Sequence, residues 1–161
     1  MDLDERVTTA YEEMRMDIHR YLLTIGLPAH AAQDITQDCF IRLFETLHGG
    51  TTVENSRAWL LRVAHNLGIN MMTAKGFDTA ELDFDQPAPA ATVVERLIEE
   101  ERKHRLRREI SLLSTQQRAC LELRAQGLRY REIGEIIGIS TSAVGEFLRR
   151  AISRLRSALS E

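Results

Sequence analysis

The chain has 161 residues, of which 43% are hydrophobic and 28% charged, so it suits one ordinary domain or two small ones and is too apolar for a disordered chain. The net charge of −3 is unevenly distributed, because residues 1–102 carry 9 Lys and Arg against 18 Asp and Glu, whereas residues 103–161 carry 12 against 6. The basic excess at the back indicates an anionic partner for that part of the chain.

The cysteine content and the first residues bear on the compartment. Cys39 and Cys120 are single thiols without a C-x-x-C pair, as expected in a reducing compartment. The segment Met1–Glu5 is acidic and lacks the apolar region of a signal peptide, and no apolar run approaches membrane-spanning length. We therefore expect a soluble cytoplasmic protein.

Helical spacing of apolar residues predicts three helices in the front part of the chain, over about 7–24, 29–47 and 57–72. Gly26 and Pro28 separate the first two, and Asn55 or Ser56 can cap the third. The apolar stripe of the first helix comprises Tyr11, Met14, Ile18, Tyr21, Leu22 and Ile25.

An acidic, proline-containing stretch follows and reads as a flexible linker. Beyond it, a charged helix is predicted over about 93–113, and Ser114 and Gln117 form a capping box that starts a further helix ending near Gly127. The predicted fold is all-α, with two small helical domains at 1–76 and 93–161 joined by the linker 77–92.

The spacing of small and apolar residues in residues 130–159 predicts a helix-turn-helix. Gly134 occupies the position where the two helices cross, Gly138 lies in the turn, and Val144 fills the space between the helices. Ser140 can cap the second helix. Two packed helices without a DNA role are the alternative, but the net charge of +6 over 103–161 favours binding to phosphates.

The second helix of this motif has an apolar face and a polar face. Its apolar stripe comprises Val144, Leu148, Ala151, Leu155 and Leu159, and its polar face comprises Ser142, Gly145, Glu146, Arg149, Arg150 and Ser153. Gly145 adds no bulk, so the helix could sit deep in a groove. Glu146 can accept a hydrogen bond from cytosine N4, and Arg149 can pair with guanine or hold a phosphate. Alternatively, Glu146 only pairs with Arg150 one turn away.

Three segments together resemble the small extracytoplasmic-function (ECF) group of sigma-70 family RNA polymerase sigma factors. Region 4 of that group is similar to "LSTQQRACLELRAQGLRYREIGEIIGISTSAVGEFLRRAISRLRSAL", including L-x-x-Q-R and G-x-x-Y-x-E-I. Regions 2.1–2.2 resemble "AAQDITQDCFIRLFETL", and regions 2.3–2.4 resemble "SRAWLLRVAHNLGINMM". The resemblance covers nearly the whole chain.

The resemblance implies a transcription initiation factor that binds core RNA polymerase through its β′ clamp helices and β flap and recognises promoter DNA. The residues implied to bind core polymerase are Asp34, Gln37 and Asp38. Those implied at the minus-ten element are Asn55, Arg57, Arg62, Asn66 and Asn70. Those implied at the minus-thirty-five element are Arg131, Thr141, Ser142, Gly145, Glu146, Arg149 and Arg150. An anti-sigma factor is a further candidate partner.

The chain departs from the group's pattern at two places. Family members commonly have Lys-Ser-Arg where this chain has Gly145, Glu146 and Phe147, and they often end region 2.4 with several arginines where this chain has only Lys75. Two other functions stay open at this point: a sigma mimic that sequesters an anti-sigma factor, and a helix-turn-helix regulator that uses the back domain alone.

The sequence does not predict an enzyme. Asp34 and Asp38 are one helical turn apart, but no nucleophile or phosphate-binding loop accompanies them. The five histidines show no ligand pair such as H-x3-H, so we expect neither a metal nor a cofactor.

Overall fold

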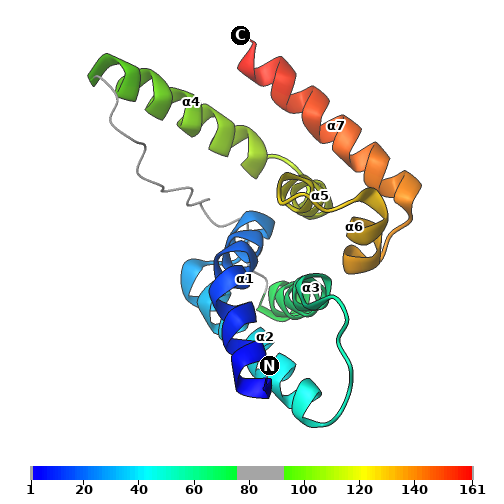
Figure 1. Ribbon diagram of the computed structural model, residues 1–161. Helices are drawn as coiled ribbons and strands as arrows, with labels where there is room; N and C mark the ends of the chain where they lie inside the picture. The colour runs from blue at the N-terminus through cyan, green and yellow to red at the C-terminus, as the bar shows by residue number, and fades with distance from the viewer. Residues whose placement is uncertain (1, 76–92, 161) are drawn as a thin grey trace.

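The computed structural model describes residues 2–75 and 93–160, and over these ranges the chain forms seven α-helices (Figure 1). The helices are α1 (Leu3–Ile25), α2 (Ala29–His48), α3 (Ser56–Lys75), α4 (Val93–Ser111), α5 (Thr115–Ala125), α6 (Tyr130–Ile137) and α7 (Thr141–Leu159). The all-α prediction is confirmed. The predicted linker, 77–92, lies outside the described residues. Among the described helices, none is both long and apolar enough to cross a membrane.

The helix boundaries follow the capping residues. Asp2 forms a capping box with Glu5, so α1 begins four residues before the predicted position 7. The side chain of Asn55 accepts a hydrogen bond from the backbone N–H of Ala58 at 3.1 Å, which makes Asn55 the cap of α3. The predicted capping box of Ser114 with Gln117 is confirmed.

Helices α1, α2 and α3 pack against one another and enclose the front core. Gly68 of α3 permits a close approach to α1, because a Cβ atom at this position would lie 3.0–3.2 Å from Leu22, Leu27 and Ile25. The prediction for Tyr11 is wrong: this side chain is 37% exposed. It lies at the rim, where its ring meets Phe40 edge-on at 5.0 Å between centroids.

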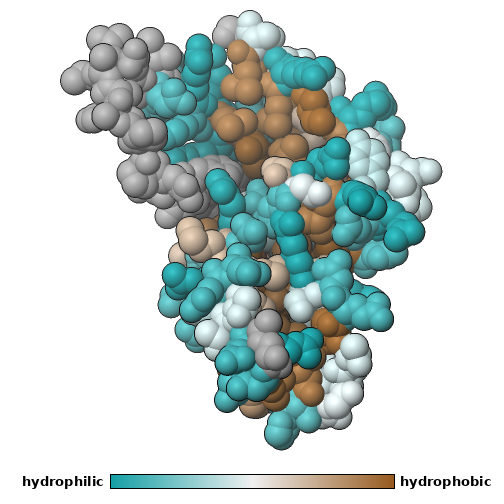
Figure 2. All heavy atoms as spheres, viewed as in Figure 1, coloured by the Kyte–Doolittle hydropathy of each residue, from teal (hydrophilic) through white to brown (hydrophobic). Residues whose placement is uncertain are grey.

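The back half is built on α4–α7, with α7 packed against α4, α5 and α6 (Figure 1). Val144, Leu148 and Ala151 are buried as predicted, but Leu159 is 43% exposed. Among the described helices, only α4 lies alongside the last turns of α7, which explains why the predicted apolar stripe emerges at the surface (Figures 1 and 2).

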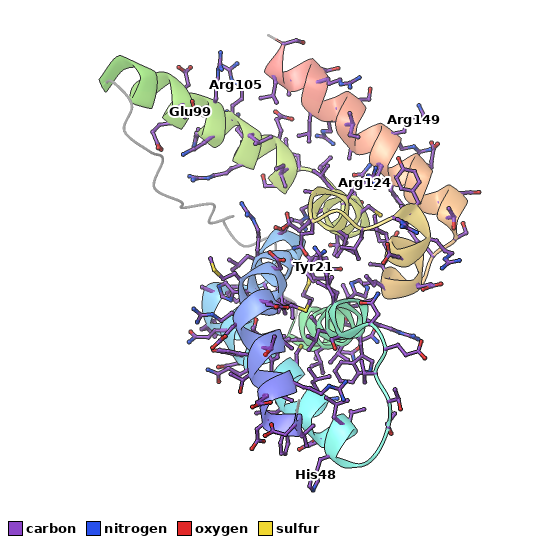
Figure 3. The ribbon with its side chains drawn as sticks, viewed as in Figure 1. Tyr21, His48, Glu99, Arg105, Arg124 and Arg149 are labelled. Atoms are coloured by element: carbon purple, nitrogen blue, oxygen red, sulfur yellow. The ribbon has the colours of Figure 1, made fainter. Side chains whose placement is uncertain are left out.

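One hydrophobic core runs through both halves of the molecule. Helix α1 packs against α5, and α3 packs against α6, so buried residues of the front and back halves belong to a single cluster. Tyr21 lies where α1, α3 and α5 come together (Figure 3). The burial of apolar surface between the halves therefore holds them against each other in this structure.

A polar pair is buried in this core. The hydroxyl of Tyr21 and Nδ1 of His65 share a hydrogen bond of 2.6 Å. Burial lowers the pKa of His65 to about 4, and burial together with the nearby Cys120 and Glu122 raises the pKa of Tyr21. His65 is therefore neutral in the folded protein at neutral pH.

We expect His65 to make the fold sensitive to acid. Its pKa is lower in the folded state than in the unfolded chain, so the unfolded state takes up the proton first as the pH falls from 6.5 towards 4. Between pH 7 and 4.5 the wild-type protein should lose about 2–3 kcal/mol more free energy of unfolding than His65→Gln, as measured by urea denaturation. His30→Gln, at an exposed position, serves as the control. Between pH 7 and 4.5 it should lose as much free energy of unfolding as the wild type.

Candidate nucleic-acid interface

Gly134 determines how closely α6 approaches the start of α7. A Cβ atom at this position would lie 2.6 Å from the carbonyl oxygen of Ile139, so any larger side chain would collide with backbone. The carbonyl oxygen of Gly134 in turn accepts hydrogen bonds from the backbone N–H groups of Gly138 and Ile139, at 2.8 and 3.0 Å. The predicted crossing position is therefore a site where the backbone of the turn leaves no room for a side chain.

The turn between α6 and α7 uses residues suited to it. Gly138 has φ +78°, a left-handed conformation that glycine adopts without a steric penalty. Ser140 then caps α7, since its hydroxyl accepts a hydrogen bond from the N–H of Ala143 at 3.1 Å. Behind the turn, Val144 is fully buried. The helix-turn-helix predicted from the sequence is present.

The outer face of α7 carries most of the residues predicted at the minus-thirty-five element. Thr141, Ser142, Arg149 and Arg150 are exposed. Figure 3 shows Arg149 pointing away from the other helices. Arg131 lies on α6 instead of α7, and its guanidinium is 3.8 Å from the carboxylate of Glu135. A helix with such an exposed polar face can enter the major groove of DNA.

Glu146 pairs with two arginines at once. Both Arg149 and Arg150 donate hydrogen bonds of 2.8 Å to its Oε1, and Arg149 donates a further one of 3.3 Å to Oε2. The hydrogen bonds from Arg149 and then Arg150 lower the pKa of Glu146, and the same contact raises the pKa of Arg149. The predicted pairing with Arg150 is present, and it extends to Arg149. A hydrogen bond from a DNA base to the carboxylate of Glu146 would therefore have to compete with these two ion pairs.

Tyr130 is the tyrosine of the G-x-x-Y-x-E-I motif, but the sequence did not predict it as a site residue. Its ring, 41% exposed, lies over Gly145, where a Cβ atom would be 3.7 Å away. The guanidinium of Arg124 stacks on the same ring, 5.4 Å from its centroid. The ring of Tyr130 therefore borders the space that a side chain at position 145 would occupy. The signal in the sequence was an aromatic residue at the start of α6 paired with a glycine on the outer face of α7.

On the front half, α3 presents a second polar face. Arg62, Asn66 and Asn70 are exposed at four-residue intervals and so lie on one side of the helix. The other two residues predicted at the minus-ten element have other contacts. Asn55 caps α3, and the guanidinium of Arg57 donates a hydrogen bond to the backbone carbonyl of Gln126 in the back half.

A third polar face lies on α2. Asp34, Gln37 and Asp38 are exposed, whereas Ile35, Cys39 and Leu43 on the opposite side are buried, as the sequence predicts. Ile41 continues the exposed face one turn further and is 54% exposed. Within the described ranges, no cluster of three or more His, Cys, Asp or Glu could hold a metal ion.

The fold and these surfaces define a helical DNA-binding protein with a helix-turn-helix at its back. Residues 10–77 match the family model for sigma-70 region 2, and residues 103–155 match that for sigma-70 region 4. The chain belongs to the sigma-70 family, as an RNA polymerase sigma factor of the ECF type. It acts in transcription initiation, and its family is not enzymatic.

Two curated relatives are similar over most of this chain. RNA polymerase sigma factor YlaC of Bacillus subtilis (strain 168) is 28% identical over 163 residues, which covers 94% of this chain and 91% of that protein. ECF RNA polymerase sigma factor SigE of Mycolicibacterium smegmatis (strain ATCC 700084 / mc(2)155) is 26% identical over 152 residues, covering 89% of this chain and 58% of SigE. This chain thus spans less than two thirds of SigE.

Two solved structures share the fold. The sigma factor RpoE in complex with the anti-sigma factor NepR from Bartonella quintana has a TM-score of 0.76 at 16% identity, covering 95% of this chain and 96% of RpoE. CnrH in complex with the cytosolic domain of CnrY has a TM-score of 0.67 at 20% identity, covering 98% of this chain and 89% of CnrH.

Gly134→Ala should lower the free energy of unfolding by about 1–3 kcal/mol, because the new methyl group meets the carbonyl of Ile139 and the helices must move apart. Gly145→Ala is the matched control. It lies inside α7, with no atom closer than 3.7 Å to the new methyl group, and should raise the free energy of unfolding by about 0.5–1 kcal/mol. Urea denaturation measures both, and equal effects of the two substitutions would contradict the assigned crossing point.

The variant Glu146→Ala tests whether Glu146 contacts a base or only forms ion pairs with Arg149 and Arg150. If Glu146 reads a cytosine, its loss should reduce preference at one base pair about five- to hundredfold. It also frees Arg149 and Arg150, so non-specific binding should rise and its salt dependence should steepen. The measurement is binding of the full chain to a randomised duplex library at two salt concentrations. An unchanged sequence profile with stronger binding overall would leave Glu146 only its pairing role.

Proposed function

We propose that this sigma factor directs core RNA polymerase to promoters through three separate surfaces. The polar face of α2 binds the β′ clamp helices, the polar face of α3 captures the minus-ten element, and the outer face of α7 reads the minus-thirty-five element. In this proposal residues 1–76 form the region 2 domain, 93–161 the region 4 domain and 77–92 the linker, and the protein works in the cytoplasm, where the polymerase is.

The observation that carries this proposal is the α2 face. Asp34, Gln37 and Asp38 are exposed, while the opposite side of the helix forms part of the front core. Acidic side chains exposed on a rigid helix suit a basic helical partner, such as the clamp helices. Ile41 supplies an exposed apolar side chain beside them, which such an interface can bury.

The minus-ten role rests on the composition and position of the α3 face. Asn66 and Asn70 carry amides that can both donate to and accept from base edges, and Arg62 can hold a phosphate. The face contains one arginine among these three residues, so the grip on duplex DNA should be weak. Recognition of separated bases is then the more suitable task for α3.

The apolar surface between α4 and α7 is the proposed site for the β flap. Leu112, Ile152 and Leu159 are 55%, 38% and 43% exposed, and Figure 2 shows hydrophobic residues gathered over this part of the molecule. Arg154 and Arg156 of α7 lie beside it and are exposed. An apolar surface with a basic rim suits an amphipathic segment with acidic flanks.

An anti-sigma factor is the second proposed class of partner. RpoE is described in complex with the anti-sigma factor NepR, and its fold extends over 95% of this chain. An inhibitor that covered the α2 face or the surface between α4 and α7 would compete with the polymerase. Native mass spectrometry of the chain with a cognate inhibitor and core enzyme should then show mutually exclusive complexes.

Reversing the charges at Asp34 and Asp38 tests the α2 assignment. The affinity of the double variant Asp34→Lys, Asp38→Lys for core polymerase should fall at least tenfold, because two attractive charges at the interface become repulsive. Circular dichroism should show unchanged helix content, since both side chains are exposed. Glu12→Lys, Glu13→Lys is the control, with the same change of charge on exposed positions of α1. Normal assembly of the α2 variant would refute this docking face.

Asn66→Ala tests the minus-ten assignment. Loss of one amide that contacts a base should reduce promoter opening, measured by permanganate reactivity, about five- to hundredfold. Core binding should be unchanged, because α2 is not altered. Gln116→Ala, which removes an exposed amide on α5 outside the three proposed surfaces, is the control. Normal opening by Asn66→Ala on a cognate promoter would reduce Asn66 to a surface residue.

A further inference from the structure

Gly145 interrupts the outer face of α7 close to the start of the helix. It lies in the second turn, next to Glu146 and one turn before Arg149. In a helix-turn-helix, the residues that contact base edges come from the N-terminal turns of the second helix. Position 145 therefore offers no side chain of α7 to the base pair in front of it.

The ring of Tyr130 lies where that missing side chain would point. Tyr130 is the first residue of α6, which packs against α7 (Figure 1). Its ring carbons Cε2 and Cδ2 would lie 3.7 and 3.9 Å from a Cβ atom at position 145, which is ordinary van der Waals contact. The hydroxyl oxygen of Tyr130 lies more than 4 Å from this point. The part of Tyr130 that faces Gly145 is thus a carbon edge of the ring.

Arg124 holds this ring in its orientation. The guanidinium carbon of Arg124 lies 5.4 Å from the ring centroid, which is a cation–π contact. Its Nη1 atom also donates a hydrogen bond of 3.0 Å to the backbone carbonyl of Leu128, a buried residue in the turn before α6. The ring of Tyr130 is nevertheless 41% exposed. An oriented aromatic edge is therefore open to solvent beside the first turns of α7.

This carbon edge suits one chemical group of the major groove, the C5-methyl group of thymine. The methyl group is apolar, and aromatic side chains contact it in protein–DNA complexes. The other groups that distinguish base pairs in this groove are hydrogen-bond donors and acceptors, which ring carbons cannot satisfy. A hydrogen bond from the hydroxyl of Tyr130 to a phosphate would not require the ring edge to lie over Gly145.

We propose that Tyr130 is a specificity-determining residue, which selects a thymine in the minus-thirty-five element by contact of its ring edge with the thymine methyl group beside Gly145. The inference rests on the proposed function, in which the outer face of α7 reads this element. A residue of α6 then reads the base pair that α7 leaves uncontacted at position 145. Glycine is required at this position because a side chain there would cover the ring edge.

Replacement of thymine by deoxyuridine tests this contact, because deoxyuridine forms the same base pair but lacks the C5-methyl group. The protein is used as holoenzyme with core polymerase, on a promoter selected from genomic DNA. Each thymine of the minus-thirty-five element, on either strand, is replaced singly, and the affinities of the two duplexes are compared by competition. For the wild type, one replacement should lower the affinity about fourfold, the factor expected for burial of one methyl group.

Three variants distinguish the ring edge from other contacts. Tyr130→Phe keeps the edge and should keep the fourfold effect at that thymine. Tyr130→Ala removes the edge, and Gly145→Ala places a methyl group against it, so both should bring the ratio of the two affinities close to one. Tyr11→Ala is the matched control, because Tyr11 is an exposed tyrosine that is also stacked by an arginine, Arg15, at 5.6 Å. It should keep the fourfold effect.

The ratio is measured between two duplexes with one protein, so partial unfolding of a variant does not alter it. The inference is overturned if no thymine methyl group of the element contributes to the affinity of the wild type, or if the methyl effect persists in Tyr130→Ala. It is also overturned if Tyr130→Phe and Tyr130→Ala weaken binding to both duplexes equally, since the hydroxyl then holds a phosphate.

The proposed function fails in a different way, if the affinity of the holoenzyme does not depend on the minus-thirty-five sequence at all. A holoenzyme that prefers one sequence but binds its thymine and deoxyuridine forms equally well contradicts the role of Tyr130 alone. The two failures are therefore distinguishable.

Discussion

Helix α3 has to satisfy three neighbours at once, and the arrangement of the molecule depends on this constraint. It packs against α1, α2 and α6, which leaves one side for solvent. Gly68 allows the close approach to α1, and His65 is buried neutral against Tyr21. The remaining side carries Arg62, Asn66 and Asn70. The polar residues of α3 are therefore held in a row by a helix that is packed on its other sides, which suits the proposed contact of its amides with bases.

The contact between α3 and α6 couples the front half to the helix-turn-helix. Helix α3, which carries the proposed minus-ten residues, packs against α6, the first helix of the motif. A shift of one of these helices therefore changes the packing of the other. Gln126 adds polar contacts to this apolar packing, because its side-chain amide donates to the carbonyl of Asp17 and its own carbonyl accepts from Arg57. Such hydrogen bonds are specific in geometry but contribute little net stability. Inter-domain contacts of this kind commonly separate when a partner binds.

The outer face of α7 illustrates how specificity and affinity compete. A single carboxylate, Glu146, pairs with both Arg149 and Arg150 and offsets one of their two positive charges. In the proposed function this pairing should lower non-specific affinity, which depends on the number of cations that displace counterions. The ring of Tyr130, stacked by Arg124, lies over Gly145 and adds an aromatic surface to this face. Both features favour a selective recognition surface over a strongly basic one.

Local chemistry allowed much of this protein to be predicted from its sequence. The capping box at Ser114, the glycines at 134 and 138, the cap at Ser140 and the exposed acidic face of α2 all follow from short-range spacing, which the chain satisfies within a few residues. Contacts between residues far apart in the sequence could not be predicted from this short-range spacing. The exposure of Tyr11 and Leu159 depends on where neighbouring helices end, and the hydrogen bond of Arg57 is made to a residue 69 positions away. Periodicity determines which side of a helix is apolar, but only the tertiary structure decides what covers that side.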